Sequence, residues 1–352
     1  MASAVRALEG KIAVVTGASR GIGRGIALQL GQAGATVYVT GRAPAASYSL
    51  IEKGLPSLEQ TAKGESLIEF CEIKSRGGEA HPVYCDHANS DDVRRLFKRV
   101  EEEQNGRLHI LVNNAYSGVP VSFFDTKFAR TSLIENAGKK FWECEPEFWD
   151  DINEVGLRNV YFCSTLAARL MDGLIVHISS AGGLQYLFSV PYGVGKAAVD
   201  RMASDMGLGR VLNGIPIKLK SRGVAVISLW PGFVQTEITT MGEKAEQFAS
   251  AARMSMDAFN AALKGAETPE FVGKAIVGLA TDRKRMAKSG KIHLTGDLAR
   301  EYGFTDQNGV VPTNLRSVRS ALQFFGWLRL AKFVPAFIKS PKVFLHFASY
   351  KF

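Results

Sequence analysis

A tyrosine and a lysine stand four positions apart in the stretch SSAGGLQYLFSVPYGVGK, residues 179–196. Residues four apart share one face of an α-helix, so Tyr192 and Lys196 are predicted to lie side by side if this segment is helical. A phenol with an ordinary pKa of about 10 is a weak acid near pH 7, and a neighbouring ammonium stabilises the phenolate and lowers that pKa. The pair is therefore a candidate for delivering a proton to a developing alkoxide, although the same spacing also occurs on many surface helices.

Two serines precede the pair, at the end of the apolar run LIVHISS, residues 174–180. If this run is a strand, successive side chains point to opposite faces, so only one serine can face the tyrosine. We predict that it is Ser180, whose hydroxyl could donate a hydrogen bond to a substrate carbonyl oxygen. The predicted catalytic residues are Ser180, Tyr192 and Lys196. The predicted substrate contacts are Ser180, Gln185 and Tyr192, because Gln185 lies in the loop between the serine and the tyrosine.

Short apolar runs alternate with helix-like segments along the chain, at residues 11–17, 35–41, 80–86, 108–114, 174–180, 223–230 and 291–296. Near-continuous apolar strands joined by helices are typical of a parallel sheet covered on both faces. The sequence therefore predicts an α/β fold, a doubly wound parallel sheet of Rossmann type, with ligands bound beyond the carboxyl ends of the strands. Three stretches, 43–66, 117–140 and 237–268, are too long for routine loops and are predicted to be lids or insertions.

A glycine-rich turn, TGASRGIGRGIALQL, follows the first apolar run and opens a helix-like segment. Glycines permit a tight turn and close approach of the backbone, and a helix N-terminus offers free amide donors to a pyrophosphate. The spacing TGxxxGxG between a strand and a helix predicts a dinucleotide site. The predicted contacts are Gly17, Ser19, Arg20, Gly21, Ile22 and Gly23.

The second apolar run ends in VTGRAP, which lacks the acidic residue that would bind the ribose 2′-hydroxyl of NAD. Arg42 in this segment and Arg20 in the glycine loop could both pair with a 2′-phosphate. We therefore predict NADP, in its reduced form NADPH, as the cofactor. The alternative is that both arginines are solvated surface residues.

Five motifs resemble those of the short-chain dehydrogenase/reductase family in order and spacing. They are TGASRGIG, NNA at 113–115, ISS at 178–180, YGVGK at 192–196 and PGFVQT at 231–236. The resemblance extends from about residue 10 to residue 300. It implies a Rossmann-type oxidoreductase acting on CH–OH or C=O groups, in which hydride passes between the nicotinamide and the substrate.

Further cofactor contacts follow from the same resemblance. It implies that Lys196 hydrogen-bonds the nicotinamide ribose and that Asp86 contacts the adenine edge. It also implies that the backbone of Val234 binds the nicotinamide carboxamide and that the hydroxyl of Thr236 contacts the pyrophosphate. Asn113 and Ala115 end the fourth predicted strand, so the rule that ligands bind at strand ends places them beside the dinucleotide.

Two positions depart from the family pattern. The family commonly carries an asparagine in W-x-x-x-x-x-V-N-L, whereas WDDINEVGL has Gly156 there, and Tyr116 stands where the family usually has glycine. The resemblance implies that the asparagine perturbs a helix so that a backbone carbonyl can hold a water, and glycine can also loosen a helix. Asn153, one turn earlier, is predicted to be a solvated helix residue rather than a replacement.

The length of 352 residues and the hydrophobic fraction of 46% are sufficient for a large core. We predict a dehydrogenase domain over residues 8–303 and a tail over residues 304–352. No acidic residue follows Asp306, and seven basic residues in the tail leave +2 of the net charge of +9 for the rest of the chain. This argues against nucleic-acid binding by the main domain. The cysteines, Cys71, Cys85, Cys144 and Cys163, have no metal-site spacing, so we expect no metal and an intracellular, reducing compartment.

The tail joins aromatic side chains, among them Phe324, Phe325, Trp327, Phe333, Phe337, Phe344 and Phe347, to basic ones. No stretch of the chain reaches the roughly 20 apolar residues needed to span a membrane. Two alternatives stay open for residues 320–352. They lie peripherally on an anionic surface such as the endoplasmic reticulum membrane, or they pack on their own domain or on the second copy in a homo-oligomer.

Together these features predict an NADPH-dependent carbonyl reductase with a small-molecule substrate. The family resemblance implies a bulky apolar ketone or secondary alcohol that is steroid-like, prostaglandin-like or xenobiotic-like. The alternatives are the oxidative direction at the same site and a non-catalytic NADP(H)-binding protein that is recruited to membranes or senses redox state. Gly156 and the aromatic tail favour the non-catalytic alternative, whereas Ser180, Tyr192 and Lys196 favour the enzyme.

Overall fold

Parallel strands form one twisted sheet with the order β3-β2-β1-β4-β5-β6-β7. The strands are β1 (Ile12–Val15), β2 (Thr36–Gly41), β3 (Glu79–Tyr84), β4 (Leu108–Asn113), β5 (Met171–Ile178), β6 (Ala225–Trp230) and β7 (Ile292–Leu294). The computed structural model describes residues 6–43, 72–118, 139–208, 221–240, 242–314, 316–319, 327–335 and 338–341, with residues 133, 136, 219 and 322. All neighbouring strands pair in parallel, so the predicted doubly wound α/β sheet is confirmed.

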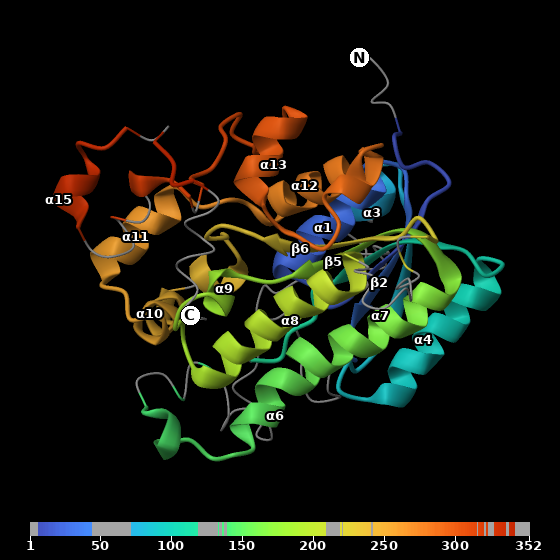
Figure 1. Ribbon diagram of the computed structural model, residues 1–352, viewed down its shortest axis with the longest axis horizontal. Coiled ribbons are helices and arrows are strands. Elements are labelled where there is room, and N and C mark those ends of the chain that lie inside the picture. The colour runs from blue at the N-terminus through green and yellow to red at the C-terminus, as the bar shows by residue number, and fades with distance from the viewer. Residues whose placement is uncertain are drawn as a thin grey trace.

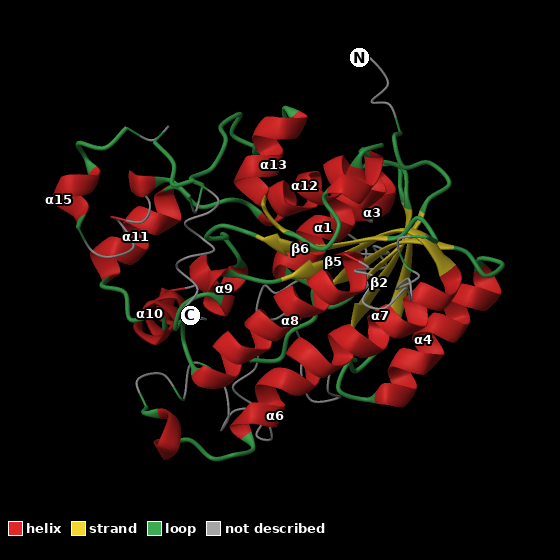
Figure 2. Ribbon diagram, viewed as in Figure 1, coloured by secondary structure: helices red, strands yellow, loops and turns green. Residues whose placement is uncertain are grey.

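Helices cover both faces of the sheet (Figures 1 and 2). One face packs against α1 (Gly21–Gln32) and α12 (Pro269–Thr281), with α3 (Glu72–Ser75) and α13 (Thr295–Tyr302) beside them. The other face packs against α4 (Ser90–Glu103), α7 (Asn159–Leu170) and α8 (Val190–Leu208). Side chains alternate along β1, so Ala13 and Val15 enter the first core and Ile12 and Val14 the second. This two-sided burial is why the strands read as continuous apolar runs.

Shorter helices extend the molecule beyond the carboxyl end of β6 (Figure 1). Of the three predicted insertions, residues 237–268 contain α9 (Glu237–Thr240), α10 (Gly242–Ala251) and α11 (Met256–Lys264). Residues 44–71 and most of 119–138 lie outside the described part of the chain. Before α7 come a 3₁₀ turn, η2 (Phe141–Glu143), helix α6 (Phe148–Asn153) and a π-helical turn, η3 (Glu154–Arg158). Two further 3₁₀ turns are η4 (Ala181–Gly183) and η5 (Arg285–Ala287).

The described part of the tail folds back onto α13. The carboxylate of Asp297 pairs with Arg316 at 2.8 Å and with Lys339 at 3.0 Å, and all three side chains are mostly buried. A backbone bridge joins Ser317 to Lys339, and a short helix, α15 (Leu328–Ala331), lies between these two residues in the chain. Contacts thus cross the predicted boundary at residue 303, which stays a prediction. None of the helices in the described ranges is long and apolar enough to cross a membrane.

Candidate active site

A cleft of about 490 Å³ opens at the carboxyl ends of the strands. It brings together nearly all of the residues predicted for the site, from segments far apart in the sequence. The predicted residues that line it are Gly17, Ser19, Arg20, Gly21, Ile22, Gly23, Arg42, Asp86, Ala115, Ser180, Tyr192, Lys196, Val234 and Thr236. The cleft lies where a doubly wound sheet is expected to bind its ligands.

Ser180 and Tyr192 meet inside this cleft, with 2.7 Å between their hydroxyl oxygens. Ser180 follows β5 and its Oγ also accepts a hydrogen bond from the backbone N–H of Gly182 at 3.1 Å, which fixes the serine rotamer. Ser179 faces the other way, is 3% exposed, and donates to the carbonyl of Lys196 at 3.3 Å. The structure therefore places Ser180, rather than Ser179, beside the hydroxyl of Tyr192.

Lys196 lies one turn beyond Tyr192 on α8, as its spacing predicts. Its Nζ donates to the carbonyl of Ile178 at 3.0 Å and lies 5.9 Å from the centroid of the Tyr192 ring. Burial lowers the pKa of Lys196 to about 8, and the nearby carboxylate of Asp200 partly opposes this. Burial also raises the pKa of Tyr192 to about 12, although the hydrogen bond from Ser180 acts in the opposite direction. In this arrangement desolvation of the phenolate outweighs the expected lowering by the lysine, so Tyr192 is a neutral hydroxyl at pH 7.

The glycine loop is shaped by close contact between backbones. Gly17 has φ +64°, and a Cβ atom there would come within 2.8 Å of the Cα of Ala115. A Cβ atom on Gly23 would meet the carbonyl oxygen of Gly17, so neither position accepts a side chain without movement. The side chain of Asn114 holds the loop by donating to the carbonyls of Thr16 at 2.9 Å and Gly17 at 3.0 Å.

The first amide of α1 already binds a negative charge. The N–H of Gly21 donates to both carboxylate oxygens of Glu237, at 3.3 and 3.1 Å. A helix N-terminus carries positive partial charge and unpaired donors, so a carboxylate there occupies the position that suits a phosphate oxygen. This contact indicates that the loop is a competent anion cradle, as the fit of a dinucleotide requires.

Comparisons with known proteins identify the family. The model of the short chain dehydrogenase family matches residues 11–63 and 58–247. Dehydrogenase/reductase SDR family member 1 from Homo sapiens is 43% identical over 352 residues, which covers 98% of this chain and 99% of that protein. The chain belongs to the short-chain dehydrogenase/reductase family. The identity extends over nearly the full length of both chains, so the similarity to this human protein is not confined to the five family motifs.

Other proteins are similar to this chain at lower identity. The 3beta-hydroxysteroid dehydrogenase of Mediterraneibacter gnavus is 26% identical and covers 84% of this chain and 95% of that protein. The structure of angucycline C-6 ketoreductase LanV with bound NADP is 25% identical, has a TM-score of 0.58, and covers 82% of this chain and 95% of that chain. A short-chain dehydrogenase/reductase from Serratia marcescens, at 23% identity and a TM-score of 0.58, supports the fold alone.

Two predicted contacts of this family member do not line the cleft. Asn113 is 2% exposed and donates to Ser164 at 3.0 Å on α7, because alternation along β4 turns its side chain to the opposite face. The neighbouring Asn114 is the residue at the cleft. Gln185 also lies away from it, because the chain turns through η4 and then presents Leu187 and Phe188 instead. Neither Asn113 nor Gln185 lines the cleft, and their roles as site residues stay predictions.

The helix around Gly156 is perturbed, as the sequence predicts. Residues 154–158 form a π-helical turn, closed by a bond from the N–H of Asn159 to the carbonyl of Glu154, five residues earlier. Asn153, expected to be solvated, is only 5% exposed. Its side-chain amide donates to the carbonyl of Pro191 at 3.2 Å, so it joins α6 to the start of α8. The sequence missed this role because it depends on how two distant helices pack.

Aromatic side chains form the wall beside Tyr192. Phe188, Phe233 and Phe248 border the cleft, and the ring of Phe188 lies 5.1 Å from that of Tyr192 and 5.3 Å from that of Phe248. Phe188 has φ +63°, a left-handed conformation uncommon for a bulky residue, and its ring meets that of Tyr192. Phe248 belongs to the insertion at residues 237–268, and Phe259 in that insertion is 1% exposed and belongs to the core. The insertion therefore supplies both a wall of the cleft and core packing.

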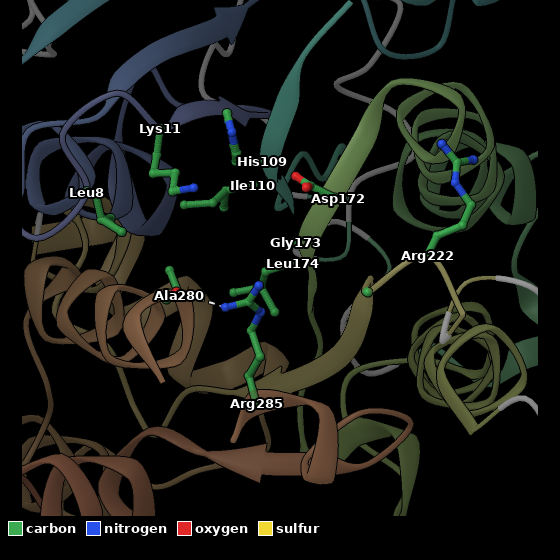
Figure 3. Close-up of a pocket in the computed structure, with 11 residues that line it drawn as sticks. Leu8, Lys11, His109, Ile110, Asp172, Gly173, Leu174, Arg222, Ala280 and Arg285 are labelled. Atoms are coloured by element: carbon green, nitrogen blue, oxygen red, sulfur yellow. Dashed lines mark hydrogen bonds between the residues drawn. The ribbon is translucent and has the colours of Figure 1, made fainter. Parts of the chain in front are cut away.

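A second cavity of about 220 Å³ lies at the opposite end of the sheet (Figure 3). Lys11, His109 and Asp172 border it near the starts of the strands, and Arg285 reaches across to the carbonyl of Ala280 at 3.5 Å. It contains none of the residues predicted for catalysis. In the described part of the chain, no group of three His, Cys, Asp or Glu side chains could hold a metal ion.

Proposed function

We propose that the protein is an NADPH-dependent carbonyl reductase. The observation that carries the proposal is the 2.7 Å contact between the hydroxyls of Ser180 and Tyr192, with Lys196 one helical turn away, in the cleft that contains the glycine loop. When bound, NADPH supplies the hydride. The loop from Gly17 to Gly23 suits its pyrophosphate, and Arg20 and Arg42 in the same cleft suit its 2′-phosphate.

The side chains of the cleft have separate roles in this reaction. The hydroxyls of Ser180 and Tyr192 bind the carbonyl oxygen, and Tyr192 gives up its proton as negative charge develops there. Burial raises the pKa of Tyr192 to about 12, which keeps the acid protonated throughout the physiological range. Lys196 places positive charge next to the phenolate that forms. Oxidation of a secondary alcohol would use the same side chains in reverse, with the phenolate of Tyr192 as the base.

A bulky apolar ketone is the proposed substrate class. Phe188, Phe233 and Phe248 offer flat apolar surfaces beside Tyr192, which suit a fused-ring or otherwise large hydrophobic body. Two relatives carry names that agree with this class, the 3beta-hydroxysteroid dehydrogenase and the angucycline C-6 ketoreductase with bound NADP. Steroid-like, prostaglandin-like and xenobiotic-like ketones are therefore the compounds to test first.

The proposal is tested by NADPH oxidation against a panel of such ketones. We expect turnover with at least one of them and faster turnover with NADPH than with NADH. If NADPH binds but no ketone is reduced, the non-catalytic NADP(H)-binding alternative is preferred.

Glu237 is expected to compete with the cofactor, because its carboxylate occupies the first amide of α1. Glu237→Gln should lower the Kd for NADPH about three- to tenfold, since a charge at a helix N-terminus is worth roughly 0.3–1 kcal/mol and also repels the pyrophosphate. Fluorescence titration of NADPH measures the change. Glu246→Gln, an exposed carboxylate on α10, is the matched control. Equal affinities for Glu237→Gln and wild type would contradict this role.

We also propose that α15 makes peripheral contact with anionic membrane, including that of the endoplasmic reticulum. Trp327 is 59% exposed and Phe333 is 85% exposed, and Arg329 and Lys332 lie between them in the chain. Aromatic side chains flanked by cations suit the interface of an anionic bilayer. The ion pairs of Asp297 with Arg316 and Lys339 hold the two ends of this segment on α13.

The double variant Trp327→Ser/Phe333→Ser should reduce co-sedimentation with phosphatidylserine-containing vesicles at least tenfold. Burial of each aromatic side chain in the bilayer would contribute about 1.5–3 kcal/mol to the binding free energy. Phe141→Ser/Trp142→Ser removes two equally exposed aromatic residues elsewhere and should leave sedimentation unchanged. If the first variant pellets as wild type does but alters the molecular mass in solution, the segment is a contact between copies of the chain.

A further inference from the structure

Tyr116 follows β4 and brings an unpredicted aromatic ring against both Tyr192 and Lys196. Its ring meets that of Tyr192 edge to face, with 6.0 Å between centroids and 82° between planes. The Nζ of Lys196 lies 5.1 Å from the Tyr116 centroid, closer than its 5.9 Å to the Tyr192 centroid. The ammonium of the lysine therefore lies near both rings, and the nearer ring is that of Tyr116 rather than that of Tyr192.

Gly156 provides the space for this ring. A Cβ atom at Gly156 would lie 3.0 Å from both Cδ2 and Cε2 of Tyr116, closer than ordinary van der Waals contact. Gly156 is buried inside the π-helical turn η3, where the backbone cannot move away freely. The missing side chain at this position thus has a packing reason. A side chain at 156 would require the ring of Tyr116 to move by a few tenths of an ångström.

Tyr116 contacts the site through the face of its ring and not through its hydroxyl. Its Oη is buried and has no hydrogen-bond partner among the described residues. A Cβ atom at Gly118 would meet this oxygen, which places the hydroxyl against that backbone. Burial raises the pKa of Tyr116 well above its usual value, so the side chain is neutral. A neutral π face is what attracts a desolvated ammonium.

We propose that Tyr116 is a positioning residue for the Tyr192–Lys196 pair: its ring face holds the Lys196 ammonium in place, and Gly156 keeps that ring in contact. The consequence for turnover rests on the proposed reductase function. The position and the pKa of Lys196 do not depend on that function, so the positioning role and the reductase function can be tested separately.

Several charged groups act on Lys196 besides the ring. Asp200 lies one turn along the same helix and favours the ammonium, whereas burial lowers the pKa of Lys196 to about 8. Asp150, Asp151 and Glu154, from α6 and η3, border the same cleft. Tyr116 adds to the groups that keep the lysine charged, and its removal should make deprotonation easier.

Tyr116→Leu keeps an apolar side chain but removes the π face. We expect the alkaline limb of the kcat/KM profile for ketone reduction to move about one pH unit lower and kcat at pH 8 to fall about fivefold, since a desolvated cation–π contact corresponds to roughly one unit of pKa. Tyr116→Phe, which keeps the face, should hold the limb within about 0.3 pH units of wild type. It should also raise the Tm, because a buried hydroxyl without a partner is removed.

A second readout does not depend on turnover. The pKa of Lys196 can be followed by NMR of ¹³Cε-labelled lysine, with the signal assigned from its loss in Lys196→Met. We expect this pKa to fall about one unit in Tyr116→Leu and to be unchanged in Tyr161→Leu, which alters an exposed tyrosine on α7. If no ketone is turned over by wild type, the proposed function fails, and this titration still decides the role of Tyr116.

The link to Gly156 is tested by a double-variant cycle. Gly156→Ala should lower kcat at least fivefold in the wild-type background although alanine normally stabilises a helix, and less than twofold in the Tyr116→Leu background, where the ring is absent. The proposal is overturned if Tyr116→Leu leaves both the pH limb and the Lys196 pKa where they are. It is also overturned if Tyr116→Phe reproduces the effect of leucine, because the hydroxyl would then be the active group.

Discussion

Tyr192→Phe is expected to lower kcat for ketone reduction by a factor of about 10² to 10⁴, because general acid catalysis by a positioned group contributes on that order. The hydroxyl lies 2.7 Å from that of Ser180, and in the proposed reaction it supplies the proton to the alkoxide. Phenylalanine fits the same space against Gly182 and Phe188, so the fold should be kept. Single-turnover oxidation of bound NADPH, followed by its absorbance, measures the chemical step directly.

The same experiment separates binding from chemistry. The Kd for NADPH should change less than about twofold in Tyr192→Phe, since Tyr192 contributes little to the pyrophosphate and 2′-phosphate contacts that dominate affinity. Ser180→Ala should reduce kcat less, by about tenfold to a hundredfold, because it removes a hydrogen-bond donor but leaves the acid. Retention of more than a tenth of the wild-type rate in Tyr192→Phe would mean that another group delivers the proton.

The sheet and the glycine loop could be predicted because their signals are local. Continuous apolar runs reflect strands buried on both faces, and the seven runs all appear as strands. The glycines at 17 and 23 are required by contacts within a few residues of the first strand and the loop after β4. Alternation along β5 correctly separated Ser180 from Ser179.

Other parts of the site could not be read from one segment. The same alternation applied to β4 turns the Asn113 side chain away from the cleft, whereas the prediction used only its position at the end of the strand. Phe188 reaches the site only through a left-handed backbone in a loop. Tyr116 and Gly156 each look like an isolated departure from the family pattern, and their connection depends on a contact between segments 40 residues apart.

Arg42→Asp is expected to reverse the preference for NADPH over NADH. Arg42 lies at the end of β2 and borders the cleft with Arg20, at the place where the ribose of a dinucleotide is expected. A charge-assisted hydrogen bond is worth roughly 1.5–3 kcal/mol, so losing one to the 2′-phosphate should raise the Kd for NADPH by about 10- to 150-fold. The new carboxylate adds repulsion for the phosphate and can accept a bond from the 2′-hydroxyl of NADH.

Both affinities should be measured on the same variant, because the argument concerns their ratio. Arg201→Asp changes an arginine on α8 that pairs with Asp205 at 2.7 Å and does not border the cleft, so it controls for net charge. A general electrostatic effect would weaken NADPH equally in both variants and would disappear at high salt. A specific contact would alter the NADPH to NADH ratio only in Arg42→Asp. If that ratio stays at the wild-type value, Arg42 is a surface residue, and Arg20 or the loop backbone must select the cofactor.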